Sequence, residues 1–100
     1  MVRHMIIWTL KDEYSDGEKA TIKQGIKEGL EGLHAKIPGL VRIQVITKGL
    51  ASSNTDLMLD TLFEDEQALK GYSGHPLHVA VANEKVRPFT KIRSCFDFEE

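Results

Sequence analysis

Four side chains that can exchange protons or donate hydrogen bonds occur where a small site could form: His4, Tyr72, His78 and Asp97. Tyr72 precedes a histidine-proline-x-histidine element at 75–78. His78 is expected in the first turn of a helix that this proline begins, where unpaired backbone amides disfavour added positive charge and keep an imidazole neutral at pH 7. A neutral imidazole can act as a general base.

These groups fit the removal of a proton next to a carbonyl group. If Asp97 accepts a hydrogen bond from one ring nitrogen of His78, the other nitrogen is free to take that proton. Tyr72 would donate to the developing enolate oxygen, and His4 would orient the substrate. The sequence therefore predicts one possible activity, that of a cyclase, lyase or isomerase that needs no cofactor.

The same residues also have a structural interpretation. His75 is expected to cap a helix, His78 to anchor Tyr72, and Asp97 to satisfy a buried ring nitrogen. His75 and His78 are three residues apart and could share a metal ion, but no cysteine or carboxylate lies close to them in sequence, so we predict no metal site. The single cysteine, Cys95, is expected to be a packed thiol.

The elements that must position these groups follow from hydrophobic periodicity. Residues 2–11 alternate and predict a strand, with one face made by Val2, His4, Ile6, Trp8 and Leu10. A capping box at 15–18 starts a long helix whose apolar stripe continues to Ile37, where Pro38-Gly39 stops it. Three glycines along one flank of this helix, at 25, 29 and 32, indicate a close approach, either by packing or by a ligand.

Further strands are predicted at 40–48, 55–63 and about 90–98, and further helices at 64–72 and 76–86. The order β-α-β-β-α-β is that of an α+β, ferredoxin-like domain with its helices on one face of an antiparallel sheet. Met5, Ile7, Met58 and Leu62 make the opposite face apolar too. Because an apolar patch of that size demands a partner, we expect a homodimer with the two sheets face to face, which closes an α/β barrel.

Composition narrows the function classes. The chain has 100 residues, a net charge of −2 and 41% hydrophobic residues, which is typical of one folded domain over 1–100. Its 13 basic residues are scattered, so a nucleic-acid partner is not expected. No apolar signal core or membrane span is evident, and we expect a cytoplasmic protein without a membrane partner.

Four stretches resemble a known family: VRHMIIWTLKD at 2–12, IPGL at 37–40, HPLHV at 75–79 after a tyrosine, and FDF at 96–98. Together they are similar to the stress-responsive dimeric α/β-barrel domain, over nearly the whole chain. The resemblance implies a homodimeric barrel with a pocket between sheet and helices. The tyrosine followed by H-P-x-H is its most specific part.

A plant polyketide cyclase of this family closes a ring by an aldol-type reaction without a cofactor. Against its pattern this sequence keeps the histidine, tyrosine and aspartate positions at His4, Tyr72, His78 and Asp97. A second pocket histidine is replaced by Leu57 and a helix tyrosine by Ile26, which implies a more apolar pocket of different shape. The resemblance implies that the pocket is lined by His4, Ile6, Trp8, Ile26, Leu57, Leu59 and Val79.

Two main hypotheses follow. The first is a homodimer that binds a small apolar or aromatic carbonyl compound without necessarily converting it, with a link to stress or secondary metabolism. The second is a cofactor-independent enzyme of the polyketide cyclase, lyase or isomerase type that uses His78, Tyr72 and Asp97. A haem- or quinone-processing monooxygenase is a third possibility, which no haem-ligation motif supports.

Overall fold

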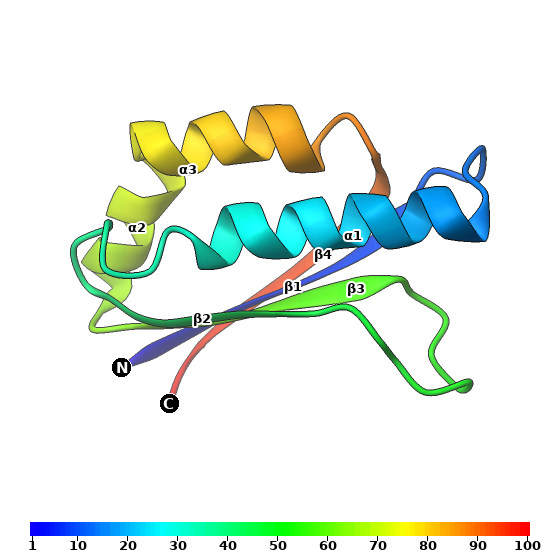
Figure 1. Ribbon diagram of the computed structural model, residues 1–100. Coiled ribbons are helices and arrows are strands. Elements are labelled where there is room, and N and C mark those ends of the chain that lie inside the picture. Colours follow the sequence, from blue (N-terminus) through cyan, green and yellow to red (C-terminus); the bar gives the residue numbers. More distant parts are fainter.

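The computed structural model describes residues 1–100, and the helices all lie on one side of the sheet (Figure 1). The elements follow the predicted order: β1 (Val2–Leu10), α1 (Asp16–Glu31), β2 (Leu40–Ile46), β3 (Leu57–Phe63), α2 (Glu66–Gly74), α3 (Pro76–Val81), a π-helical turn η1 (Ala82–Val86) and β4 (Thr90–Glu99). The strands pair antiparallel in the order β2-β3-β1-β4. This is the ferredoxin-like fold that the sequence predicts.

The helix-facing side of the sheet forms the core. On β1 the buried positions alternate as the sequence predicts, and Leu10 is fully buried. On β3, Leu57, Leu59 and Phe63 face the same way and belong to the same core cluster. The central strand β1 therefore holds the chemistry-bearing His4 on the side covered by the helices.

The long helix is shorter than predicted. Its N-terminus carries the predicted capping box between Ser15 and Glu18, but α1 ends at Glu31 and not at Ile37. Gly32 is the C-cap, and Ala35 adopts a φ of 65°, so residues after Glu31 continue as turns. Leu33 and Ile37 are buried all the same, which is why the apolar stripe extends beyond the helix.

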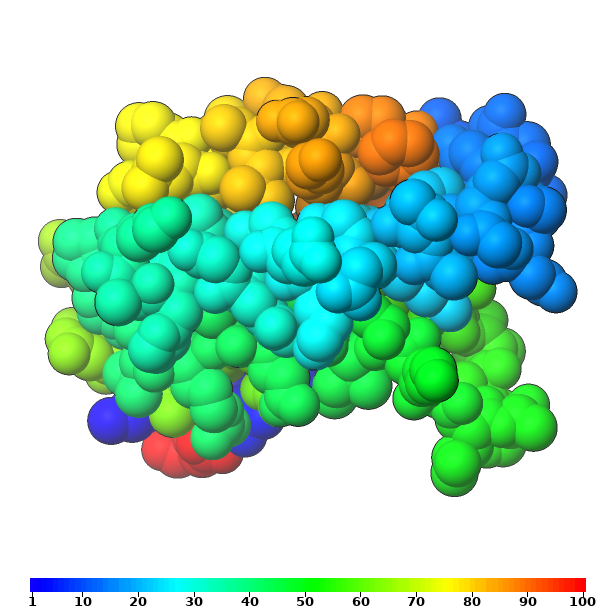
Figure 2. Space-filling view, viewed as in Figure 1, coloured from blue at the N-terminus to red at the C-terminus, as the bar shows by residue number.

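Of the glycines along α1, Gly29 permits a close approach by another helix. A Cβ on Gly29 would lie 2.9 Å from Cγ1 of Val81, because α3 passes close to α1 there, whereas nothing approaches Gly25 within 4 Å. Figure 2 shows α3 (yellow) and η1 (orange) lying along the cyan part of α1. This close packing fixes α1 and α3 against each other on the helix side of the cavity.

The opposite face of the sheet is not covered by any element of the chain. Register places Ile92 and Phe96 of β4 beside Thr9 and Met5 of β1 on this bare face. Phe96 is 70% exposed and Ile92 is 52% exposed. No helix combines the length and the hydropathy needed to cross a bilayer.

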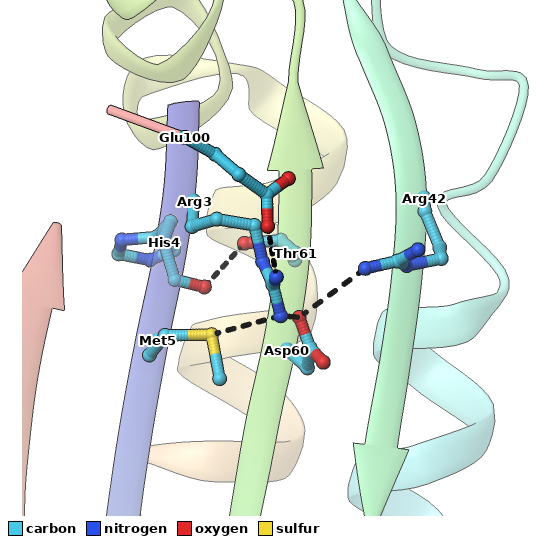
Figure 3. A network of polar contacts seen from close by, with 7 residues as sticks. All are labelled: Arg3, His4, Met5, Arg42, Asp60, Thr61 and Glu100. Carbon is cyan, nitrogen blue, oxygen red and sulfur yellow. Dashed lines mark hydrogen bonds and ion pairs between the residues drawn. The ribbon is translucent and has the colours of Figure 1, made fainter. Parts of the chain in front are cut away.

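An ion-pair network lies on the bare face, where the two ends of the chain meet (Figure 3). One guanidinium nitrogen of Arg3 lies 2.7 Å from the Asp60 carboxylate and another lies 2.6 Å from Glu100. Arg42 approaches the same Asp60 oxygen at 4.0 Å. Two cations and two carboxylates therefore balance one another on this face.

Candidate functional site

A cavity of about 170 Å³ lies between the sheet and the helices. Its sheet side is formed by residues of three strands: His4, Ile6, Trp8, Leu59, Thr90 and Arg93. Its helix side is formed by residues from α1 to the turn after η1: Leu30, Tyr72, Ser73, His78, Ala82, Val86 and Arg87. The cavity therefore brings together three of the four residues singled out in the sequence.

Tyr72 and His78 form the polar centre of this cavity. Their ring centroids are 4.1 Å apart with an interplanar angle of 35°. Tyr72 is 1% exposed, and its hydroxyl has no hydrogen-bond partner. Burial raises the pKa of this phenol, so the hydroxyl keeps its proton and can donate. An unpaired buried donor is costly, and a ligand oxygen would relieve that cost.

His78 is held as a neutral base. Its Nδ1 lies 3.3 Å from the Ser73 carbonyl oxygen, which can only accept, so the proton is on Nδ1 and Nε2 is the basic nitrogen. Partial burial lowers the pKa of His78, and the charges of Arg87 and Arg93 lower it further. The imidazole is therefore neutral at neutral pH.

The expected pairing of Asp97 with His78 is wrong. Asp97 Oδ1 lies 2.5 Å from Nδ1 of His4, and the Ser73 carbonyl orients His78 in its place. The reason is strand register, because His4 and Asp97 are direct cross-strand partners on β1 and β4. Asp97 does not line the cavity. It satisfies a buried ring nitrogen, as in the structural interpretation of the sequence.

Cys95 lies beside this pair. Its Sγ is 3.4 Å from the Asp97 carboxylate and 3.8 Å from His4 Nδ1. The thiol is exposed in the subunit and not packed as predicted, because β4 is an edge strand beyond the helices. Burial and the Asp97 carboxylate raise its pKa, so it is a thiol and not a thiolate. The ligand atoms of His4, Cys95 and Asp97 lie within 4.8 Å of one another, which makes them the residues that could hold a metal.

His75 is a helix-entry residue, as predicted. Its Nδ1 accepts a hydrogen bond from the backbone amide of Leu77 at 3.1 Å, which caps α3. That nitrogen is therefore already engaged, and His75 is not among the cavity residues. His34 is exposed.

The other predicted pocket residues divide into two groups. Ile6, Trp8 and Leu59 line the cavity. Ile26 and Leu57 are core residues with 0% and 3% exposure, and neither lines it. Val79 is half-buried on α3 and also lies outside it.

Sequence reasoning missed the two arginines of the cavity. Arg93 is the cross-strand partner of Trp8, so it shares the helix-facing side of the sheet with that residue. Alternation along β4 could have placed it there once the register was known. Arg87 follows η1 directly, and nothing in the sequence indicated that its side chain reaches the site.

Comparisons with known proteins agree with this fold. A family model described as the stress responsive A/B barrel domain matches residues 2–100. No curated protein sequence matches the chain. A dimeric protein of unknown function from Bacteroides fragilis, with a ferredoxin-like fold, superposes with a TM-score of 0.91 at 28% identity, over 99% of this chain and 95% of its own.

Two enzymes share the fold at lower identity. A hydroxynitrile lyase from Passiflora edulis gives a TM-score of 0.71 at 14% identity, over 97% of this chain and 90% of its own. A cofactor-independent oxygenase from Streptomyces nogalater gives a TM-score of 0.73 at 14% identity, over 99% and 91%. Identities this low show a common fold alone.

Proposed function

This chain belongs to the stress responsive A/B barrel domain family, and from that premise we propose that it is a homodimer that binds a small aromatic carbonyl compound. The compound would occupy the cavity between sheet and helices. The observation that carries the proposal is the Tyr72 hydroxyl, a buried donor without a partner on the wall of that cavity. Such a group is stabilised when a ligand oxygen accepts from it.

The size and lining of the cavity support the same conclusion. An apolar cavity of roughly 150 Å³ is enough to bind benzene, and this one measures about 170 Å³. Ile6, Trp8 and Leu59 give it apolar walls, while Tyr72 and His78 supply polar groups on one side. A few placed polar groups in an apolar pocket are typical of small-molecule sites.

The bare face of the sheet supports the homodimer. Its apolar side chains include Phe96 and Ile92, which are mostly exposed in a single subunit. An exposed apolar face of this kind marks an interaction site, and an identical face on a second copy is self-complementary by symmetry. The Bacteroides fragilis protein that superposes on this chain is dimeric.

Binding can be measured through Trp8, which is the only tryptophan and lines the cavity. We expect benzaldehyde to change Trp8 fluorescence and to bind more tightly than toluene, because only the aldehyde oxygen can accept from Tyr72. One hydrogen bond corresponds to a preference of roughly fivefold in affinity. Tyr72→Phe should remove that preference. Equal affinities of the wild-type protein for both compounds would contradict the assignment of Tyr72.

The matched control is Tyr14→Phe. Tyr14 is the only other tyrosine, and its ring packs near Phe89 outside the cavity. This variant should keep the wild-type preference for benzaldehyde. Absence of binding by either compound, in a folded wild-type protein, would refute the cavity as a ligand site.

A second candidate function is proton abstraction next to a carbonyl group. It is favoured by the contact between a neutral His78, whose Nε2 is unprotonated, and the ring of Tyr72, which carries a free hydroxyl donor. His78 would take the proton and Tyr72 would donate to the enolate oxygen. Asp97 would act at a distance, by holding His4 at the cavity wall.

Deuterium exchange separates this activity from binding alone. In heavy water the protein should catalyse exchange of the methyl protons of acetophenone, followed by proton NMR. His78→Gln should abolish the exchange and keep binding, whereas His34→Gln, at an exposed position, should change neither. If the wild-type protein exchanges the methyl protons no faster than buffer does, the proposed proton abstraction is wrong and only the binding function remains.

A further inference from the structure

Two of the four arginines line the cavity, and neither has a carboxylate partner. Arg93 forms no ion pair, and Arg87 donates to the side-chain amide oxygen of Asn83, which is neutral. None of the thirteen residues around the cavity is an aspartate or glutamate. The site therefore carries two positive charges that the protein itself does not balance.

Both charges act on the polar centre of the cavity. Arg87 and Arg93 each lower the pKa of His78, and Arg93 also favours the ionised form of Tyr72 against the larger effect of burial. The nearest acidic group on β4, Asp97, is bonded to His4 and lies outside the cavity lining. No carboxylate within the cavity lining offsets the positive potential of the two arginines, since Asp97 lies behind His4.

We propose that the ligand of this cavity is an anion, a single-ring compound that carries a carboxylate, with the carboxylate at Arg87 and Arg93 and the ring against Tyr72 and His78. This inference rests on the proposed small-molecule function and names its ligand class. Guanidinium groups suit carboxylates because their planar donors match two oxygens at once. A negative group would also neutralise the uncompensated charge, which a neutral carbonyl compound cannot do.

Benzoate and benzamide test the charge alone, because the two molecules have nearly the same shape. We expect benzoate to bind about tenfold more tightly at neutral pH, as charge-assisted hydrogen bonds exceed neutral ones by that margin. The preference should shrink as sodium chloride is added, because salt screens the attraction. Trp8 fluorescence and calorimetry would report both affinities.

Variants identify the source of the preference. Arg93→Gln and Arg87→Gln should each reduce it, the double variant should abolish it, and Arg93→Lys should retain part of it. The matched control is Arg42→Gln on the bare face, which should leave it unchanged. Unchanged thermal unfolding shows that the cavity variants are folded, which is expected for Arg93 because it is exposed at an edge strand.

The outcomes separate this inference from the function on which it rests. If benzamide and benzaldehyde bind as tightly as benzoate, the cavity is a ligand site for neutral compounds and the charge inference is wrong. If none of the three binds, the proposed function itself is refuted. If benzoate is preferred but Arg42→Gln removes the preference, the anion lies on the other face of the sheet and the inference fails.

Discussion

The arginines on the two sides of the sheet differ in whether a carboxylate pairs with them. On the bare face, Arg3 lies 2.7 Å from Asp60 and 2.6 Å from Glu100, so its charge is balanced within the subunit (Figure 3). On the cavity face, Arg87 and Arg93 have no carboxylate. A face that is to be covered by protein needs its charges paired beforehand, because unpaired charges are costly to desolvate. On a face that binds an anionic ligand, by contrast, the cationic side chains can remain unpaired in the free protein and pair with the ligand.

Aromatic side chains show the same contrast. Around the cavity His4, Phe63 and Tyr72 pack in tilted or edge-on contacts and are buried. On the bare face Phe96 and Phe98 contact each other and stay exposed. The first group is already folded into the core, whereas the second gains its burial only when another surface covers it.

The largest expected effect separates core from interface. Leu59→Ala should lower the free energy of unfolding by about 2–5 kcal/mol at every protein concentration, because it empties part of the core. Phe96→Ser should instead raise the dimer dissociation constant at least tenfold, measured by sedimentation. Leu50→Ser, at an 82% exposed position in the loop before β3, is the control for both. A wild-type protein that sediments as a single subunit at micromolar concentration would contradict the contrast.

A smaller effect is expected from the pair between β1 and β4. Asp97→Ala leaves Nδ1 of His4, which is 6% exposed, without its bond, and should cost about 1–3 kcal/mol in urea unfolding. The NMR titration of His78 should stay as in the wild type, because Asp97 bonds His4 and not His78. Asp12→Ala, which removes an exposed partner of Lys91, should have little effect on stability. A shifted titration of His78 alone would mean that Asp97 serves His78 after all.

The smallest expected effect concerns pH. The pKa of His78 is lowered in the fold, chiefly by burial, so the unfolded chain binds its proton more readily. The stability from the neutral ring is therefore complete above the unfolded value of about 6.5 and is lost as pH falls through the lower folded pKa. His78→Gln should lose less stability than the wild type between neutral pH and pH 5. An identical loss in both proteins would show that His78 is not buried as described.

Much of the fold followed from local patterns. Alternation identified β1 and β3, and the capping box identified the start of α1. The end of α1 was predicted six residues too late, because Leu33 and Ile37 are buried in turns that happen to continue the helical spacing. Periodicity reports burial, and it does not show whether the buried residue is helical.

The site was harder to predict because it depends on register. Tyr72 and His78 could be paired from one short segment, and in the structure their tilted rings are in contact. The partner of Asp97 could not be predicted in this way. The pairing of β1 with β4 joins residues 93 positions apart in sequence and is set by tertiary packing. Arg93 was missed for the same reason.

We expect a ligand to bind on the cavity face of the sheet and not on the bare face. NMR of the aromatic rings during a titration with benzoate tests this directly. We expect the resonances of Tyr72, His78 and Trp8 to shift in proportion to occupancy, while those of Phe96 and Phe98 stay in place. Shifts confined to Phe96 and Phe98 would place the ligand on the opposite side of the sheet and contradict the account.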